Sequence, residues 1–452
     1  MLNTNSEYLR PEIMDVLRAF DMEEEEFTHY FSYSGGKFFN SIQYGVRFFD
    51  FEDKFDPADD IEFKRYAKRF AKLAFYKVLS EIKGINLPWG ALTGIRPTKL
   101  AYMEKASGRD FKELFEKLCV SKENIALVEK ILQVQNGVCC GGKSLYISIP
   151  FCPTKCDYCS FITAPVDKTK QYIEKYVDCL VREIESIEPL IKGVSSVYIG
   201  GGTPFVLENE YLRRIYEAVA AVVKDDAEYT VEAGRPDVFT PEKLELSKRY
   251  GVNRICVNPQ SFNDDTLKAI GRKHTCEQTL RAYAEAAAYG FDINVDLIAG
   301  LADETYSDFQ KSIEKAISLD PANITVHTLS LKSGAKLKEN LKRLHVNGIE
   351  EMISVSRRLL TTAGYEPYYL YRQKYQAGGY ENVGWCKHGK ACLYNIDVME
   401  EFADNIAVGA NAISKRVFAK EERIERYATP KDIPTYLSKI DSIISKRIEF
   451  FK

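Results

Sequence analysis

The chain has 452 residues, a length that suggests two or three domains and enough apolar material for a large core. Hydrophobic residues make up 45% of the chain and charged residues 28%, and 62 Lys and Arg residues against 65 Asp and Glu residues leave a net charge of -3. These values exclude an intrinsically disordered chain and argue against a protein that binds nucleic acid through a polybasic surface.

Hydropathy and cysteine content indicate the compartment. No stretch reaches the roughly 18 consecutive apolar residues of a membrane span, and the first residues lack a basic segment followed by an apolar one. We therefore predict a cytoplasmic protein without a membrane span. In a reducing compartment the 11 cysteines do not predict a disulfide framework, so a cluster among them would bind metal or act in catalysis.

Residues 1–135 predict a small α+β domain. Alternating apolar and polar residues at His29–Tyr33 and Phe38–Asp50 flank Gly35-Gly36, which is typical of a β-hairpin. A long helix is expected to open at Asp56-Pro57, because apolar residues then recur at three- and four-residue spacing. The balanced charge of this region argues against an RNA-binding role.

Residues 143–331 predict strands that alternate with helices. The six apolar runs are Leu145–Ile149, Val194–Ile199, Tyr229–Glu232, Ile255–Val257, Phe291–Ile298 and Ile324–Leu329. Apolar strands joined by helical crossovers predict an α/β fold with a parallel sheet covered by helices. A barrel or partial barrel of this kind, here a partial (β/α)6 TIM-type barrel, places its chemistry at the C-terminal strand ends. Residues 332–452 predict a mostly helical C-terminal region.

Three cysteines follow the first of these strands. Cys152, Cys156 and Cys159 have the spacing C-x3-C-x2-C. A structural zinc site takes four Cys or His ligands, and no histidine lies nearby in the sequence. Three thiolates on a tight loop suit a 4Fe-4S cluster better, because they hold three irons and leave the fourth open to a small molecule. The other eight cysteines, including the pair Cys139-Cys140, are expected to be ordinary thiols.

Polar or small residues also stand near the ends of the next four strands. A Gly-Gly-Gly-Thr run at Gly200–Thr203 follows the second strand, where glycines would let the backbone approach a bound ligand. Glu232 ends the third strand, Gln260 ends the fourth, and Asp296 lies on the fifth. Any one of them could be a helix cap or a satisfied core hydrogen bond. Their common position favours a site.

These motifs resemble those of the radical S-adenosylmethionine (SAM) superfamily. From about Lys143 to Lys415 the chain is similar to the oxygen-independent coproporphyrinogen III dehydrogenases, nearest the HemZ type, and residues 1–135 look like the extension of that type. The resemblance implies a 4Fe-4S cluster on Cys152, Cys156 and Cys159 and two SAM molecules. One SAM would contact Tyr146, Gly201 and Glu232, with Ile413 nearby. The other would contact Tyr158, Gly202, Thr203, Gln260, Arg272 and Asp296.

The resemblance also implies a reaction. In this family a 5'-deoxyadenosyl radical removes a hydrogen from a propionate of coproporphyrinogen III, which loses carbon dioxide and one electron, and two rounds give protoporphyrinogen IX in haem biosynthesis. A flavodoxin or ferredoxin-type protein would donate electrons, and residues 332–452 would cover the substrate. Four propionates call for cations, and the candidates are Arg372, Lys374 and Arg96, which could equally be solvated surface charges.

Two departures from the family's pattern keep alternatives open. The first departure is that Ser160-Phe161 stand where related oxidases often have a further cysteine. The second is that the segment around His388 does not contain the His-Asn pair of the haem-trafficking relatives. A lone loop histidine is more often solvated than a haem ligand. The alternatives are a haem-binding trafficking protein and an anaerobic haem-modifying methyltransferase.

Overall fold

The computed structural model describes residues 1–94, 96–138, 140–159, 161, 163–223, 227–330, 348–373, 379–421 and 423–452. Contacts divide the chain into two compact units. Unit 1 consists of Met1–Glu129 and Arg372–Tyr380, and unit 2 of Lys130–Tyr371 and Glu381–Lys452. The predicted division into regions 1–135, 143–331 and 332–452 stays a prediction.

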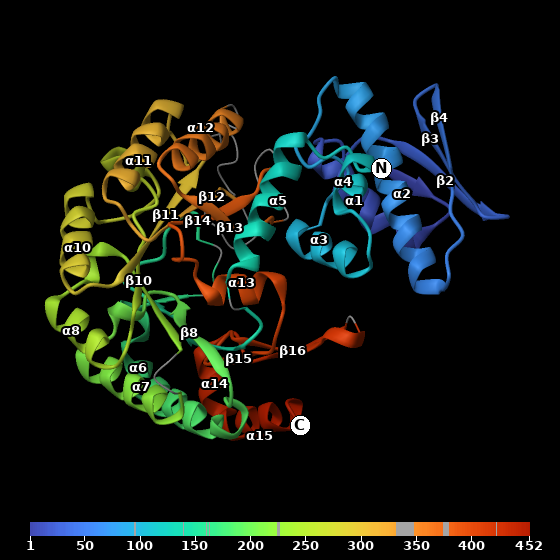
Figure 1. Cartoon of the computed structure of the whole chain (residues 1–452). Coiled ribbons are helices and arrows are strands. Elements are labelled where there is room, and N and C mark those ends of the chain that lie inside the picture. The colour runs from blue at the N-terminus through green and yellow to red at the C-terminus, as the bar shows by residue number, and fades with distance from the viewer. Residues whose placement is uncertain are drawn as a thin grey trace. The chain divides into compact units, whose positions relative to one another are not determined.

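Unit 1 is built on a four-stranded sheet in the order β1-β2-β3-β4 (Figure 1). The strands are β1 (Leu2–Thr4), β2 (Phe27–Ser34), β3 (Lys37–Tyr44) and β4 (Arg47–Lys54). The helices are α1 (Arg10–Ala19), α2 (Asp60–Lys83), α3 (Pro97–Ala106) and α4 (Phe111–Lys117), and α5 (Lys122–Asn136) crosses the division between the units. Helix α2 packs on the sheet through residues such as Phe75, whose ring lies 5.9 Å from that of Phe27.

The predicted hairpin of unit 1 is present, with differences at its ends. Gly35 and Gly36 have φ angles of 56° and 74°, the left-handed conformation that a tight hairpin turn requires. The run Phe38–Asp50 turns back at Gly45 and so forms two strands. Helix α2 begins after Asp59, whose carboxylate accepts hydrogen bonds from the first turn, a few residues later than the expected start.

Unit 2 contains an 11-stranded sheet in the order β13-β14-β12-β11-β10-β9-β8-β5-β15-β16-β17. The seven neighbouring strands from β12 to β15 are parallel. They are β5 (Lys143–Ile149), β8 (Val194–Gly201), β9 (Glu228–Gly234), β10 (Arg254–Val257), β11 (Asp292–Ala299), β12 (Asn323–Thr328) and β15 (Asn405–Val408). All six predicted strands are among them. No pairing among the described strands joins β13 to β17 into a closed barrel.

Helices connect these strands and cover the outer face of the sheet, where Figure 1 shows α7, α8, α10 and α11 in a row. Their bounds are α6 (Val166–Ser186), α7 (Asn209–Val222), α8 (Pro241–Arg249), α9 (Asp264–Ala269), α10 (Cys276–Ala288), α11 (Tyr306–Ser318) and α12 (Ile349–Thr362). Amphipathic patterning explains this layer, since each helix buries one apolar face against the strands. Among the described residues, every helix is too short or too polar to span a lipid bilayer.

The C-terminal part of the chain carries helices and also strands that the sequence analysis did not identify. The helices are α13 (Leu393–Glu400), α14 (Ile433–Ser438) and α15 (Ile440–Phe450). The strands besides β15 are β13 (Glu366–Tyr371), β14 (Asn382–Cys386), β16 (Ile413–Phe418) and β17 (Arg423–Ala428). Strand β15 has only four residues and β17 is largely polar, so neither has a strong apolar pattern.

Candidate functional site

The cysteine loop, residues 152–159, follows the C-terminal end of β5. The short strands β6 (Phe151–Cys152) and β7 (Ala164–Pro165) pair at its base. Cys156 is buried, and Cys152 and Cys159 are partly exposed. Burial raises the pKa of the Cys152 thiol and raises that of Cys159 to about 11, and the neighbouring thiols of the loop further disfavour ionisation of both. The three thiols therefore lie within electrostatic reach of one another.

The donor set of this loop distinguishes two kinds of metal site. Among the described residues, no group of three or more His, Cys, Asp or Glu side chains is arranged to hold a metal ion. A mononuclear site such as structural zinc needs its ligands to converge on one atom. Thiolates that bind a 4Fe-4S cluster each take a different iron and so surround a wider space. Three soft donors on one sheltered loop fit a cluster, and their assignment as its ligands stays a prediction.

The glycine turn Gly200–Thr203 lies directly against the cysteine loop. The N–H of Thr203 donates to the carbonyl oxygen of Phe151 over 2.7 Å, and its Oγ1 donates to Cys152 Sγ over 3.6 Å. A Cβ atom at Gly202 would lie 2.4 Å from the Phe151 oxygen, so the packing of the chain itself requires glycine here. The turn thus approaches the chain itself closely, and its predicted approach to a bound ligand stays a prediction.

Glu232 faces the same turn from β9. Its Oε2 accepts a hydrogen bond from the N–H of Gly201 over 3.3 Å. Burial, with a contribution from the charge of Asp296, raises the pKa of Glu232 to about 8. The carboxyl group is therefore mostly protonated at neutral pH and can donate a hydrogen bond as well as accept one. Nearby, the rings of Tyr146 and Tyr198 stack with centroids 6.3 Å apart.

Three buried polar atoms near the ends of β10 and α9 have no hydrogen-bond partner in the described part of the chain. They are Asn258 Oδ1, Gln260 Oε1 and Arg272 Nε. Arg272 Nη1 donates to the carbonyl oxygen of Asn258 over 2.5 Å, which places the Arg272 side chain against the segment that contains Asn258 and Gln260. Gln260 also has a φ of 71°, a strained conformation for a residue with a side chain. Buried polar atoms are normally satisfied, so these atoms fit a polar ligand such as SAM.

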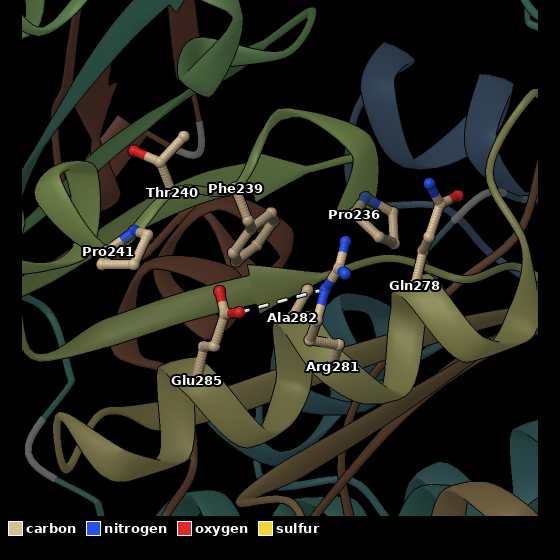
Figure 2. A pocket seen from close by; sticks show the side chains of 8 residues that line it. All are labelled: Pro236, Phe239, Thr240, Pro241, Gln278, Arg281, Ala282 and Glu285. Carbon is tan, nitrogen blue, oxygen red and sulfur yellow. Dashed lines mark ion pairs between the residues drawn. The ribbon is translucent and has the colours of Figure 1, made fainter.

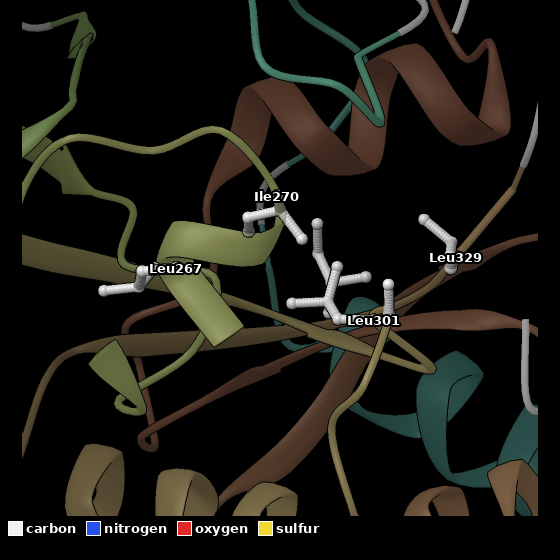
Figure 3. Close-up of a cluster of buried hydrophobic side chains, with 6 residues drawn as sticks. Leu267, Ile270, Leu301 and Leu329 are labelled. Atoms are coloured by element: carbon white, nitrogen blue, oxygen red, sulfur yellow. The ribbon is translucent and has the colours of Figure 1, made fainter. Parts of the chain in front are cut away.

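Arg272 also joins this region to the cysteine loop. Its Nη2 donates to Tyr158 Oη over 3.0 Å. The Tyr158 ring packs against a buried apolar cluster. The cluster consists of Leu267, Ile270, Ile298, Leu301, Ala302 and Leu329, and Figure 3 labels four of them. The second half of the cysteine loop is therefore anchored by polar and apolar contacts together.

Asp296 is already engaged by neighbouring side chains. Its Oδ1 accepts from Asn294 Nδ2 over 2.7 Å, and its Oδ2 lies 3.8 Å from His327 Nε2. Although burial opposes its ionisation, His327, Asn294 and Thr325 hold the pKa of this carboxyl below its ordinary value. The Asn294 and His327 contacts were missed by the sequence analysis, because a single polar residue within an apolar strand carries no distinct signal. The predicted contact of Asp296 with SAM stays a prediction.

Ile413, Arg96 and Arg372 take no part in the hydrogen bonds described above. Ile413 begins β16 and is 47% exposed. Arg96 and Arg372 belong to unit 1, where the two Nη groups of Arg372 donate to the backbone oxygens of Leu92 and Gly379. Those donors are occupied, which does not favour a role in binding propionate. Lys374 and Cys139 lie outside the described residues.

Two further features lie outside this set of contacts, namely His388 and a surface pocket. His388 is 98% exposed, and its Nδ1 lies 3.4 Å from Glu366 Oε2, as expected of a solvated histidine. A surface pocket of about 200 Å³ is lined by Pro236, Phe239, Thr240, Pro241, Gln278, Arg281, Ala282 and Glu285 (Figure 2). None of the predicted site residues lines this pocket, so it lies outside the predicted site.

Comparison with known proteins gives three results. Residues 146–316 match the family model of the radical SAM superfamily. The chain is 35% identical over 423 residues to the oxygen-independent coproporphyrinogen-III oxidase-like protein HemZ of Bacillus subtilis, covering 88% of this chain and 83% of that protein. It is 30% identical over 281 residues to the heme chaperone HemW of Escherichia coli, covering 61% of this chain and 70% of that protein.

A solved structure supports the same fold. The coproporphyrinogen III oxidase HemN of Escherichia coli, described as a radical SAM enzyme, superposes with a TM-score of 0.55 at 22% sequence identity. The match covers 69% of this chain and 72% of the HemN chain. At this identity the likeness concerns the fold alone.

Proposed function

We propose that this chain, which belongs to the radical SAM superfamily and within it to the family of the oxygen-independent coproporphyrinogen-III oxidase-like protein HemZ, is an anaerobic oxidoreductase that decarboxylates propionate side chains of coproporphyrinogen III. The membership implies a 4Fe-4S cluster and SAM as cofactors. Cys152, Cys156 and Cys159 are the proposed cluster ligands. A flavodoxin or ferredoxin-type protein is the proposed electron donor.

One observation carries most of this proposal. The cysteine loop, the glycine turn and the buried polar atoms near Arg272 form one continuous set of contacts at the C-terminal strand ends. Thr203 links the turn to Cys152, and Arg272 links Tyr158 to Asn258. This is the edge at which parallel α/β sheets place their chemistry.

The chain's own residues would hold the cofactors and exclude water. When bound, the cluster would supply the one-electron reduction of SAM, and SAM would supply the radical that oxidises a propionate to a vinyl group, with release of carbon dioxide and of one electron to an acceptor. Glu232, protonated at neutral pH, offers a hydrogen bond beside the turn without adding a negative charge. Arg272 and Gln260 would orient polar groups of SAM through the atoms that now lack partners.

Product analysis tests this function. Protein reconstituted anaerobically with iron and sulfide is incubated with SAM, dithionite and coproporphyrinogen III, and the porphyrins are oxidised and separated. We expect products that carry one or two vinyl groups, with carbon dioxide released in equal number. SAM cleavage without any vinyl product would reject this substrate while leaving the radical chemistry intact.

Haem binding is a second candidate, because the chain is also similar to proteins named heme chaperones. The same purified protein, mixed with haem and freed of excess, would show a stable Soret band if it carries haem. His388, an exposed histidine that follows β14, is the proposed haem ligand. Loss of the Soret shift in His388→Ala, together with absence of vinyl product, would favour the chaperone function over the oxidoreductase.

A further inference from the structure

Arg235 makes a contact with the cysteine loop that the proposed function does not use. It follows β9 in the run Glu-Ala-Gly-Arg-Pro-Asp. Its Nη1 donates to Oγ1 of Thr154 over 2.5 Å. Thr154 stands between Cys152 and Cys156, so this hydrogen bond reaches the first half of the loop.

The guanidinium is held in place from its other edge by Asp237. Nε donates to Oδ1 over 2.9 Å and Nη2 to Oδ2 over 2.6 Å, a two-point pairing that fixes the plane of the guanidinium. The Arg235 side chain is only 4% exposed. Burying a charged arginine costs free energy unless the guanidinium is paired. The pairing with Asp237 therefore holds the Arg235 guanidinium in a fixed geometry.

Two buried arginines thus approach the cysteine loop, Arg235 from the segment after β9 and Arg272 from the segment after α9. Arg272 contacts Tyr158 in the second half of the loop, and Arg235 contacts Thr154 in the first half. The pairing with Asp237 neutralises Arg235, so this contact adds no net charge beside the cysteines. An arginine is suited to the task, because its rigid fork binds the carboxylate and the hydroxyl at once, whereas lysine offers one point charge.

We propose that Arg235, oriented by Asp237, is a positioning residue that fixes the segment between Cys152 and Cys156 through Thr154. The inference rests on the proposed function, in which these cysteines hold a cluster. The expected consequence of losing this contact is a more mobile cysteine loop. Without the Thr154 hydrogen bond the segment between the two thiols samples more conformations, so the loop retains iron less well.

Two substitutions of Thr154 provide a matched test. Thr154→Val keeps the shape of the side chain and removes the hydroxyl, and Thr154→Ser keeps the hydroxyl. In reconstituted protein we measure the rate of iron release to a chelator and the electron paramagnetic resonance spectrum of the reduced cluster. We expect Thr154→Val to release iron about tenfold faster with a broadened spectrum, as for loss of one charge-assisted hydrogen bond, and Thr154→Ser to match the native protein.

Arg235→Met should reproduce the effect of Thr154→Val, and combining the two should add little further. Arg254→Met is the control, because Arg254 is equally buried but begins β10, at the opposite end of the strand from the site, and it should lower the melting temperature without changing the spectrum. Native iron release and an unchanged spectrum in Thr154→Val would overturn the inference alone. Absence of iron from the native protein would instead overturn the proposed function on which it rests.

Discussion

Gly202 occupies a position where a larger residue has no room. A Cβ atom there would lie 2.4 Å from the Phe151 oxygen and 2.9 Å from the Ile149 oxygen, and both are backbone atoms that cannot rotate away. The N–H of Gly202 donates to the same Ile149 oxygen over 2.7 Å. The glycine turn is thus seated on the strand end from which the cysteine loop leaves, and the two must fit together before either can hold a ligand.

Gly202→Ala should therefore disturb the cysteine loop. The added methyl group forces the turn away from the strand, at a cost of about 1 to 3 kcal/mol, the range of overpacked cores. We expect a lower melting temperature and less iron bound after reconstitution. Gly137→Ala is the control, since its Cβ would meet its nearest neighbour at an ordinary 3.5 Å. Equal behaviour of the two variants would show that the turn and the loop are not coupled.

Gln260 offers a test of ligand binding at the single-residue scale. Its buried Oε1 lacks a partner, so Gln260→Leu removes an unsatisfied acceptor and should leave the melting temperature of SAM-free protein unchanged or higher. If SAM supplies the missing partner, the same change should weaken SAM binding about tenfold. Gln278→Leu, which breaks the capping box of α10, should lower stability and spare SAM affinity. Native SAM affinity in Gln260→Leu would remove Gln260 from the site.

Glu304 should make the stability of the fold depend on pH. It is 7% exposed, Ser261 Oγ donates to its Oε1 over 2.5 Å, and burial raises its pKa to about 8 from an ordinary 4.5. The folded chain therefore keeps a proton that the unfolded chain releases, so this contribution to stability is complete below about pH 4.5 and is lost as the pH rises through 8.

Glu304→Gln keeps the shape of the side chain and cannot ionise. Its melting temperature should exceed that of the native protein at pH 8.5 and lose that advantage at pH 5. Glu245→Gln, on the exposed face of α8, should match the native protein at both values. A constant difference between Glu304→Gln and the native protein across this range would contradict the raised pKa.

At the scale of elements, the C-terminal helices are tied to α6 by a buried ion pair. Glu183 of α6 and Arg447 of α15 form an ion pair in which both side chains are fully buried. Glu183 Oε2 also accepts from the N–H of Gly409, over 2.8 Å, and from Tyr436 Oη of α14. The Glu183 carboxylate therefore connects α6 with α14, with α15 and with the loop that follows β15.

Breaking this pair on one side should destabilise unit 2 strongly. Arg447→Met leaves a buried carboxylate without its cation, and such losses cost about 3 to 5 kcal/mol. Glu183→Gln combined with Arg447→Met should lose less than the sum of the single changes, as measured by urea unfolding. The surface pair Arg182–Asp441 also joins α6 to α15, and Arg182→Met should cost less than about 1 kcal/mol. Similar losses in Arg447→Met and Arg182→Met would contradict the assignment of the buried pair as the main tie.

The elements that could be predicted from the sequence are those with strong local signals. The six strands of residues 143–331 are apolar runs separated by helical patterns, and the Gly35-Gly36 hairpin has glycines where the turn needs them. Strand β15 could not be predicted, because it has four residues and its pairing with β5 joins segments more than 250 positions apart in the sequence. The single glycine at Gly45 gave too weak a signal to divide Phe38–Asp50 into two strands.

The same limit applies to the candidate site. Cysteine spacing and polar residues at strand ends are visible in the sequence, so the loop and the turn could be singled out, whereas Arg272 was identified through the family resemblance. The roles of Asn258 and Arg235 were not predicted, because only the folded chain brings the carbonyl oxygen of Asn258 to Arg272 and the guanidinium of Arg235 to the Thr154 hydroxyl. Arg372 was chosen as an unpaired cation, but a sequence does not show that backbone oxygens occupy its donors.

At the scale of the whole molecule, one unit carries all of the contacts proposed for the cofactors. The cysteine loop, the glycine turn, Glu232 and Arg272 belong to unit 2, together with the 11-stranded sheet that positions them. The chemistry proposed for this unit begins with reductive cleavage of SAM, and every later step depends on it. The proposed radical SAM chemistry therefore depends on this cleavage of SAM and on the three cysteines proposed to hold the cluster.

The most direct test is the amount of 5'-deoxyadenosine formed from SAM under dithionite, without oxygen, by reconstituted native protein, Cys156→Ala and Cys179→Ala. Cys179 is a partly exposed thiol on α6 and controls for the loss of a cysteine. We predict about four irons per chain and 5'-deoxyadenosine formation in the native protein and Cys179→Ala, with neither in Cys156→Ala. Retained iron and SAM cleavage in Cys156→Ala, or no cleavage in the iron-loaded native protein, would contradict the account.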